Sequence, residues 1–210
     1  MNKNQKFRTQ MWVLAVFIAV IFGAILIFHN VSKDNTDLAS VPEFMPSEPG
    51  KALLVEFGDF QCPACGFYYT LVKKLKEEFG DRLEVVFKQF PLRAIHRNAD
   101  LAARASEAAR LQNKFLEMHN ILFEKQSEWS NSDDALAIFT SYAENLGLER
   151  DKFIEDIDSD TVRDRINADY QEGVKNKVNS TPTFYLNGKK ISPGSYDEFR
   201  QLIEHAIAVP

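Results

Sequence analysis

Two cysteines, Cys62 and Cys65, are the residues best suited to chemistry in this sequence, and they enclose the motif Cys-Pro-Ala-Cys. The motif separates a short apolar run from a segment with helical periodicity. Cys62 is therefore predicted to cap a helix, with Pro63 at its first position, where a missing N–H costs nothing. Unpaired amide N–H groups and the helix dipole favour a thiolate on Cys62. Such a thiolate is the attacking and leaving group of disulfide exchange, and the more shielded Cys65 is placed to resolve a mixed disulfide.

Two structural uses of the pair compete with this redox interpretation. An inert disulfide between residues i and i+3 closes too small a loop to stabilise much. A zinc site needs two more ligands. The four histidines show no paired spacing: His29, His96, His119 and His205. The sequence therefore predicts a redox-active Cys62–Cys65 pair that needs neither a cofactor nor a metal.

Composition and charge exclude several other classes of protein. The 210 residues are 45% hydrophobic and 26% charged, which is typical of a globular domain large enough to fold without disulfide staples. The net charge is −5. A broad nucleic-acid-binding surface is not expected, because such a surface needs clustered lysines and arginines.

The elements around the cysteines follow from apolar patterning. Residues 52–57 are predicted to form a strand and residues 83–90 a second one. Between them, apolar residues at helical spacing run from Pro63 until Gly80 stops the helix. A right-handed β-α-β connection makes the two strands parallel.

The middle of the chain is predicted to be helical, because it lacks glycine from 81 to 146 and proline from 92 to 181. Amphipathic patterns indicate helices at 99–111, 114–123, 133–146 and 160–175. Strands return at 183–186 and 189–191, joined by an Asn187-Gly188 hairpin signal. A Ser195–Glu198 capping box opens a last helix, to about residue 206.

The sequence Gly-Asp-Phe-Gln-Cys-Pro-Ala-Cys, the helical insertion and the later Thr181-Pro182-Thr183-Phe184 occur in one order. In this combination, the chain resembles the DsbA-like thiol–disulfide oxidoreductases of the thioredoxin superfamily, and more narrowly their membrane-anchored bacterial members. The resemblance covers residues 51–206. It implies an α/β thioredoxin-like fold over 51–210, with a mixed central sheet and an insertion at about 92–177. It also implies a protein disulfide oxidase.

The resemblance also implies roles for particular residues. Thr181-Pro182 would be a cis peptide packed beside Cys62, with the Thr181 backbone free to pair with an extended substrate. Glu56 would be a buried acid beneath the cysteines. Burial would raise its pKa and let it exchange a proton with Cys65. Lys88 is a candidate charge partner for Glu56, with a solvated lysine as the alternative.

Several nearby residues were assigned on weaker patterns. Phe60 is predicted at the rim of the active site, as a substrate-binding residue. His96 and His119 are predicted to cap or pack in the insertion. Ala64 departs from the Cys-Pro-His-Cys of the family's strongest oxidants and offers no charge or donor. We therefore expect an intermediate redox potential, and a lowered Cys62 pKa due mainly to the helix terminus.

An unbroken apolar run covers residues 11–28, which as a helix spans about 27 Å, close to a bilayer core. Three cations in residues 1–10 predict a cytoplasmic N-terminus and an extracytoplasmic catalytic domain. A cleaved signal peptide is the alternative. Residues 29–50, with three prolines, are predicted to be a linker. Beyond residue 10, 22 basic residues face 30 acidic ones, a charge of about −8.

The predicted partners follow from these assignments. Substrates would be cysteine-containing exported proteins, and the resemblance implies a quinone-linked membrane oxidase that regenerates the disulfide. A monomer is expected. A reductase or isomerase of the same fold, and a redox-silent chaperone that binds unfolded chains, remain the alternatives.

Overall fold

The computed structural model describes residues 48–208. Within this range, one sheet has the strand order β2-β1-β3-β4. The central strand β1 (Ala52–Gly58) runs parallel to β2 (Leu83–Gln89) and antiparallel to β3 (Thr183–Leu186), which pairs with the edge strand β4 (Lys189–Ile191). The predicted mixed sheet and its parallel first pair are confirmed.

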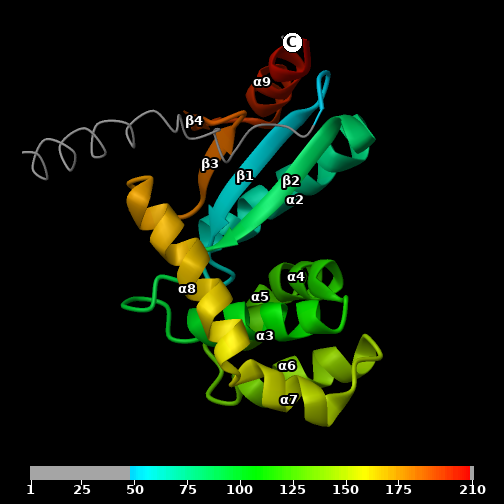
Figure 1. Ribbon diagram of the computed structural model, residues 1–210, viewed down its shortest axis with the longest axis vertical. Coiled ribbons are helices and arrows are strands. Elements are labelled where there is room, and N and C mark those ends of the chain that lie inside the picture. The colour runs from blue at the N-terminus through cyan, green and yellow to red at the C-terminus, as the bar shows by residue number, and fades with distance from the viewer. Residues whose placement is uncertain (1–47, 209–210) are drawn as a thin grey trace, which may run out of the picture. The chain divides into compact units, whose positions relative to one another are not determined.

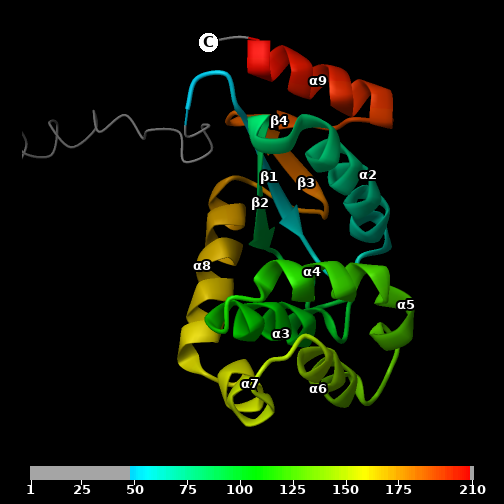
Figure 2. The ribbon, with the colours of Figure 1, turned by 90° about the vertical axis from the view of Figure 1, so that its right-hand side faces the viewer.

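Helices cover both faces of the sheet. Figure 2 shows α2 (Pro63–Phe79) and α9 (Tyr196–Ala208) on one side and α8 (Asp160–Lys175) on the other. Alternate residues of β1 face opposite layers: Leu54 packs with the α2 and α9 side chains, and Val55 packs with the aromatic residues below α8. All seven residues of β1 are buried, as expected for a central strand covered on both faces.

The insertion forms a helical unit beyond the ends of β1 and β2, and α8 leads back from it to the sheet (Figure 1). Its core includes the fully buried Trp129, Phe139 and Phe153. The helices of this unit are α3 (Ala99–Leu111), α4 (Phe115–Glu124), α5 (Gln126–Trp129), α6 (Ala135–Asn145) and α7 (Arg150–Ile157).

Most predicted elements are confirmed within one or two residues, but α5 and α7 were not predicted. Both are short, and short helices depend on tertiary packing more than on local pattern. Phe153 and Ile157 supply that packing for α7. The capping box of α9 is only half present. The Ser195 hydroxyl accepts from the Glu198 N–H, whereas the Glu198 carboxylate accepts from Gly194.

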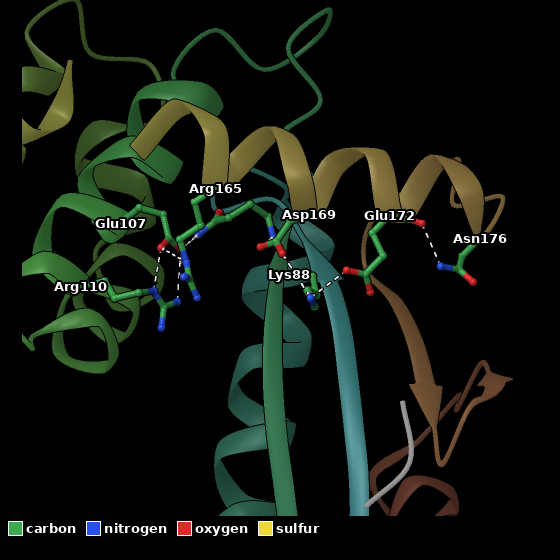
Figure 3. Close-up of polar contacts among 8 residues, drawn as sticks. Lys88, Glu107, Arg110, Arg165, Asp169, Glu172 and Asn176 are labelled. Carbon is green, nitrogen blue, oxygen red and sulfur yellow. Dashed lines mark hydrogen bonds and ion pairs between the residues drawn. The ribbon is translucent and has the colours of Figure 1, made fainter. Parts of the chain in front are cut away.

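Ion pairs join α8 to the strand β2. Lys88 Nζ lies 2.8 Å from Glu172 and 3.3 Å from Asp169, as Figure 3 shows. Neither the pairing of Lys88 with Glu56 nor the solvated alternative is correct, because Glu56 pairs with Phe87 in the register and Lys88 faces the other side of the sheet. Further along α8, Arg165 contacts the buried Glu107 of α3.

Within residues 48–208, no helix is long and apolar enough to cross a bilayer. The predicted anchor at 11–28 lies outside the described residues, as do residues 1–10 and most of the predicted linker 29–50. These segments therefore remain sequence-based predictions.

Candidate active site

Cys62 lies at the start of α2, as predicted. It is the N-cap residue, with extended backbone angles, and Pro63 follows in the first turn. Cys62 is 7% exposed, whereas Pro63 and Ala64 beside it are exposed. Only a small part of Cys62 is therefore accessible to a substrate, which would approach it past Pro63 and Ala64.

The surroundings of Cys62 favour its thiolate form. A hydrogen bond from the Cys65 thiol is the largest cause, and it outweighs burial to lower the pKa of Cys62 from 9.0 to about 5. Thr181 and the backbone N–H groups of Cys65 and Ala64 lower it further. The expected direction is correct, but the expected leading cause is not. The partner thiol contributes more than the helix terminus.

Cys65 has the opposite character. It is completely buried, and both cysteines are free thiols in this structure. Burial is the largest cause that raises the pKa of Cys65 well above its ordinary value, and nearby Cys62 and Glu56 raise it further. The Asp59 backbone N–H, 3.5 Å from Cys65 Sγ, opposes this shift. The pair thus combines an acidic thiol near the surface with a shielded one beneath it.

Glu56 is buried on β1, with 3% exposure, on the same face as the α2 helix. Desolvation, followed by the charge of Cys62, raises its pKa from 4.5 to about 8. Its Oε1 atom has no hydrogen-bond partner among the described residues. A carboxyl group in this setting holds its proton near neutral pH, and it can give that proton to a nearby thiolate.

Thr181 and Pro182 complete the site from the far end of the sequence. The peptide bond between them is cis, as the resemblance implied. The Thr181 carbonyl accepts a hydrogen bond from Cys62 Sγ at 3.3 Å. The Thr181 hydroxyl is buried and unpartnered within residues 48–208, so it is available to a thiolate on Cys62.

The prediction that Phe60 lies at the rim is wrong. Its side chain is 1% exposed and packs against Phe87 and Phe123, which fill the junction between sheet and insertion. The aromatic residue that is exposed near the cysteines is Phe67, at 60%. The apolar pattern of this helix does not show which of its residues are buried, and the buried face of α2 runs through Tyr69, Val72 and Leu75.

The two histidines of the insertion differ. His119 packs among aromatic rings, as predicted, and burial lowers its pKa to about 4. His96 Nδ1 instead lies 2.7 Å from the buried carboxylate of Asp59. Asp59 was not among the predicted site residues. The signal for it in the sequence is an acidic residue three positions before Cys62, within the motif Gly-Asp-Phe-Gln-Cys-Pro-Ala-Cys.

Polar side chains of the insertion hold the active-site loop. Gln126 Nε2 donates to the carbonyl groups of Phe60 and Cys62, at 2.6 and 3.0 Å. Gln61 bonds Ser130 and accepts from the Asn98 N–H. No sequence pattern singled out these glutamines, because the segments they join are far apart in the chain.

Within the described part of the chain, no group of three or more histidine, cysteine, aspartate or glutamate side chains is arranged to hold a metal ion. The zinc alternative for Cys62 and Cys65 therefore finds no further ligands there.

Comparison with known families agrees with this geometry. A family model described as thioredoxin matches residues 47–205. The chain belongs to the thioredoxin family. Among solved structures of this family's fold, BdbD from Bacillus subtilis, in its oxidised form, is 25% identical with a TM-score of 0.68, over 78% of this chain and 91% of that chain.

A second structure, the oxidoreductase DsbA from Xylella fastidiosa, has a TM-score of 0.64 at 18% identity, over 80% of this chain and 91% of that one. At that identity the likeness concerns the fold alone. Together with the family match and the likeness to BdbD, it shows that this thioredoxin-family chain has a DsbA-like fold.

The curated relatives are much longer than this chain. A protein named Na(+)/H(+) antiporter NhaA 1, from Mycobacterium sp. (strain KMS), is 39% identical over 140 residues, 66% of this chain and 22% of that protein. A Herminiimonas arsenicoxydans protein named Na(+)/H(+) antiporter NhaA is 34% identical over 150 residues, 71% of this chain and 23% of that protein. The chain thus spans about a fifth of the length of these relatives, whose names describe the whole proteins.

Proposed function

We propose that this protein is an extracytoplasmic thiol–disulfide oxidase that forms disulfides in exported proteins through Cys62 and Cys65. The observation that carries the proposal is the asymmetry of the pair. The Cys62 pKa is lowered to about 5, while burial raises that of Cys65. A stabilised Cys62 thiolate favours the reduced form of the enzyme, and an enzyme with a stable reduced form gives its disulfide away.

The proposed reaction has two exchange steps. A substrate thiolate attacks Cys62 of the Cys62–Cys65 disulfide, the S–S bond breaks, and Cys65 leaves as a thiolate. Glu56 gives that thiolate its proton. A second substrate thiolate then attacks the substrate sulfur of the mixed disulfide and releases Cys62 as a thiolate. The substrate loses two electrons and two thiol protons, and the cysteine pair gains the two electrons.

The loop that contacts Cys62 through Thr181 also borders a cavity. The cavity has a volume of about 220 Å³, and its lining includes Tyr68, Pro182 and Pro193 as well as the polar Ser180 and Lys190. The exposed Phe67 ring packs edge-on against Tyr68 at 5.4 Å between centroids. We propose that this cavity and the exposed Phe67 ring hold an unfolded segment of the substrate, while the Thr181 backbone pairs with its extended main chain.

We further propose a position outside the cytoplasmic membrane. The apolar run at 11–28 would anchor the chain as a monomer with its N-terminus inside, and residues 51–210 would work on the other side. The reduced pair would return its electrons to a quinone-linked membrane oxidase.

The decisive measurement is the redox potential of the full-length chain, equilibrated in glutathione buffers and read by alkylation shift. A potential well above about −180 mV would support a donor of disulfides. A potential below about −250 mV would instead indicate a reductase, and would overturn the oxidase proposal.

A trapping experiment separates the proposal from a redox-silent chaperone. In a Cys65→Ser variant, residue 65 can no longer attack Cys62 and expel a substrate from a mixed disulfide, so exported proteins should accumulate in covalent complexes with Cys62. Cys62→Ser is the matched control and should trap none. If both variants bind the same proteins without covalent complexes, the chaperone interpretation replaces ours.

A further inference from the structure

One peptide group touches the buried sulfur of the pair. The N–H of Asp59 points at Cys65 Sγ, 3.5 Å away, directly after the end of β1. The carbonyl of the same peptide unit belongs to Gly58 and accepts a hydrogen bond from the Phe90 N–H at 2.8 Å. The plane of this peptide is therefore fixed from the side of residues 90–98, which follow β2.

The Asp59 side chain is fixed by the same segment. Its carboxylate is completely buried, and Oδ2 accepts from the Leu92 N–H at 2.9 Å. The same oxygen lies 2.7 Å from His96 Nδ1, and Oδ1 accepts from the Gln61 N–H at 2.7 Å. The two backbone groups can only donate, and an ionised carboxylate can only accept, so His96 donates through Nδ1 when Asp59 is ionised.

Buried carboxylates need such partners, and removing one leaves polar atoms without compensation. His96 is the side chain among these donors, and it is 17% exposed. It is also the donor that a substitution can remove without touching the backbone. His96 therefore helps to hold the Asp59 side chain, and with it the position of the Asp59 peptide, alongside the Phe90 N–H that holds the Gly58 carbonyl.

From these contacts we infer that His96 is a positioning residue for disulfide exchange, which acts through Asp59 to hold a hydrogen-bond donor on Cys65 Sγ. The donor matters in the first step of the proposed reaction. When a substrate thiolate attacks Cys62, the S–S bond breaks and negative charge develops on Cys65. A pre-oriented N–H aimed at that sulfur stabilises the charge. Protonation of Cys65 by Glu56 follows.

The inference rests on the proposed exchange at Cys62 and Cys65, but not on its direction. Cys65 is the leaving group whenever a thiolate attacks Cys62 of the disulfide. The redox potential can therefore overturn the oxidase proposal without affecting this test.

The test measures the rate at which dithiothreitol reduces the Cys62–Cys65 disulfide in the full-length chain. We expect His96→Ala to slow this reaction about tenfold, the effect of losing one hydrogen bond to a charged group. His96→Asn keeps an N–H donor near the Nδ1 position and should restore most of the rate. His205→Ala is the matched control, because His205 is exposed on α9.

A second readout separates positioning from loosened structure. Alkylation of Cys62 by iodoacetamide in the reduced protein does not use Cys65 as a leaving group, so its rate should stay within about twofold in His96→Ala. Equal losses in reduction and Cys62 alkylation would overturn the inference, as would no rescue by asparagine or unchanged reduction in His96→Ala.

Discussion

The Cys62 thiol donates a hydrogen bond to the Thr181 carbonyl at 3.3 Å, across 119 positions of sequence. The contact joins the start of α2 to the loop before β3, so the nucleophile and the proposed substrate-binding backbone form one surface. It also means that two segments of the chain set the environment of Cys62, and only the Cys-Pro-Ala-Cys motif is local.

The pKa of Cys62 should depend on its partner thiol more than on the helix. The hydrogen bond from Cys65 is the largest cause of the shift to about 5. Cys65→Ala should therefore move the midpoint of Cys62 alkylation toward higher pH, and Cys65→Ser, which keeps a donor, should move it less. The measurement is the rate of iodoacetamide alkylation against pH. Identical midpoints in wild type and Cys65→Ala would show that the helix terminus dominates after all.

Glu56 should make the reduced protein less stable as pH rises. Its pKa is about 8 when folded and about 4.5 when unfolded, so above pH 4.5 the unfolded state releases a proton that the folded state keeps. The contribution of Glu56 is complete below pH 4.5 and is lost as pH rises through 8. Glu56→Gln should remove this loss and be more stable at pH 9 by about 3 to 5 kcal/mol, at 1.36 kcal/mol per pKa unit.

Urea unfolding of the reduced wild type and Glu56→Gln at pH 4, 6.5 and 9 measures the difference. The comparison isolates the contribution of Glu56 together with its coupling to Cys62, whose lowered pKa stabilises the reduced protein above pH 5. A constant difference across this range would place Glu56 in contact with water. In stopped-flow experiments, Glu56→Gln should also slow exchange near neutral pH, and unchanged rates from pH 6 to 9 would remove Glu56 from the mechanism.

The sequence predicted the redox pair, the parallel β1–β2 pair and the hairpin because these are carried by local patterns. It also placed Glu56, since a carboxyl group inside an apolar strand is conspicuous. It did not predict which aromatic side chain would be exposed. Helical periodicity identifies the apolar residues of a segment, but not which of them the insertion covers. Phe60 is buried because Phe87 of β2 and Phe123 of α4 pack against it.

Tertiary contacts also determine the partners of the polar residues. Lys88 forms ion pairs with Asp169 and Glu172 on α8. The sequence of β2 alone does not indicate this pairing. Asp59 and Gln126 acquire their roles because the insertion folds back over the active-site loop. Helix periodicity predicts the existence of the insertion, but not which of its side chains reach the cysteines.

Phe67 should contribute to substrate binding. Its ring is 60% exposed next to the cavity beside Pro182, so removing it deletes apolar surface that the substrate would cover. Phe67→Ala should raise KM for a cysteine-containing unfolded protein about tenfold with kcat nearly unchanged, as expected for the loss of about 1.4 kcal/mol of uniform binding. Leu136→Ala, an exposed apolar residue on α6, is the control. Equal KM values for the two variants would place the substrate elsewhere.

Gly173 lets α8 approach the sheet closely enough to anchor the insertion. A Cβ atom there would lie 2.6 Å from the Phe90 ring and 3.1 Å from that of Phe57. Gly173→Ala should therefore lower the free energy of unfolding by about 1–3 kcal/mol, although alanine is the better helix former. Gly194→Ala, whose nearest contact would be 3.4 Å, is the matched control for urea unfolding. Because α8 connects the insertion to the sheet, Gly173→Ala should also slow disulfide reduction. A variant more stable than wild type would mean that the two rings can move apart and that the close approach is not required.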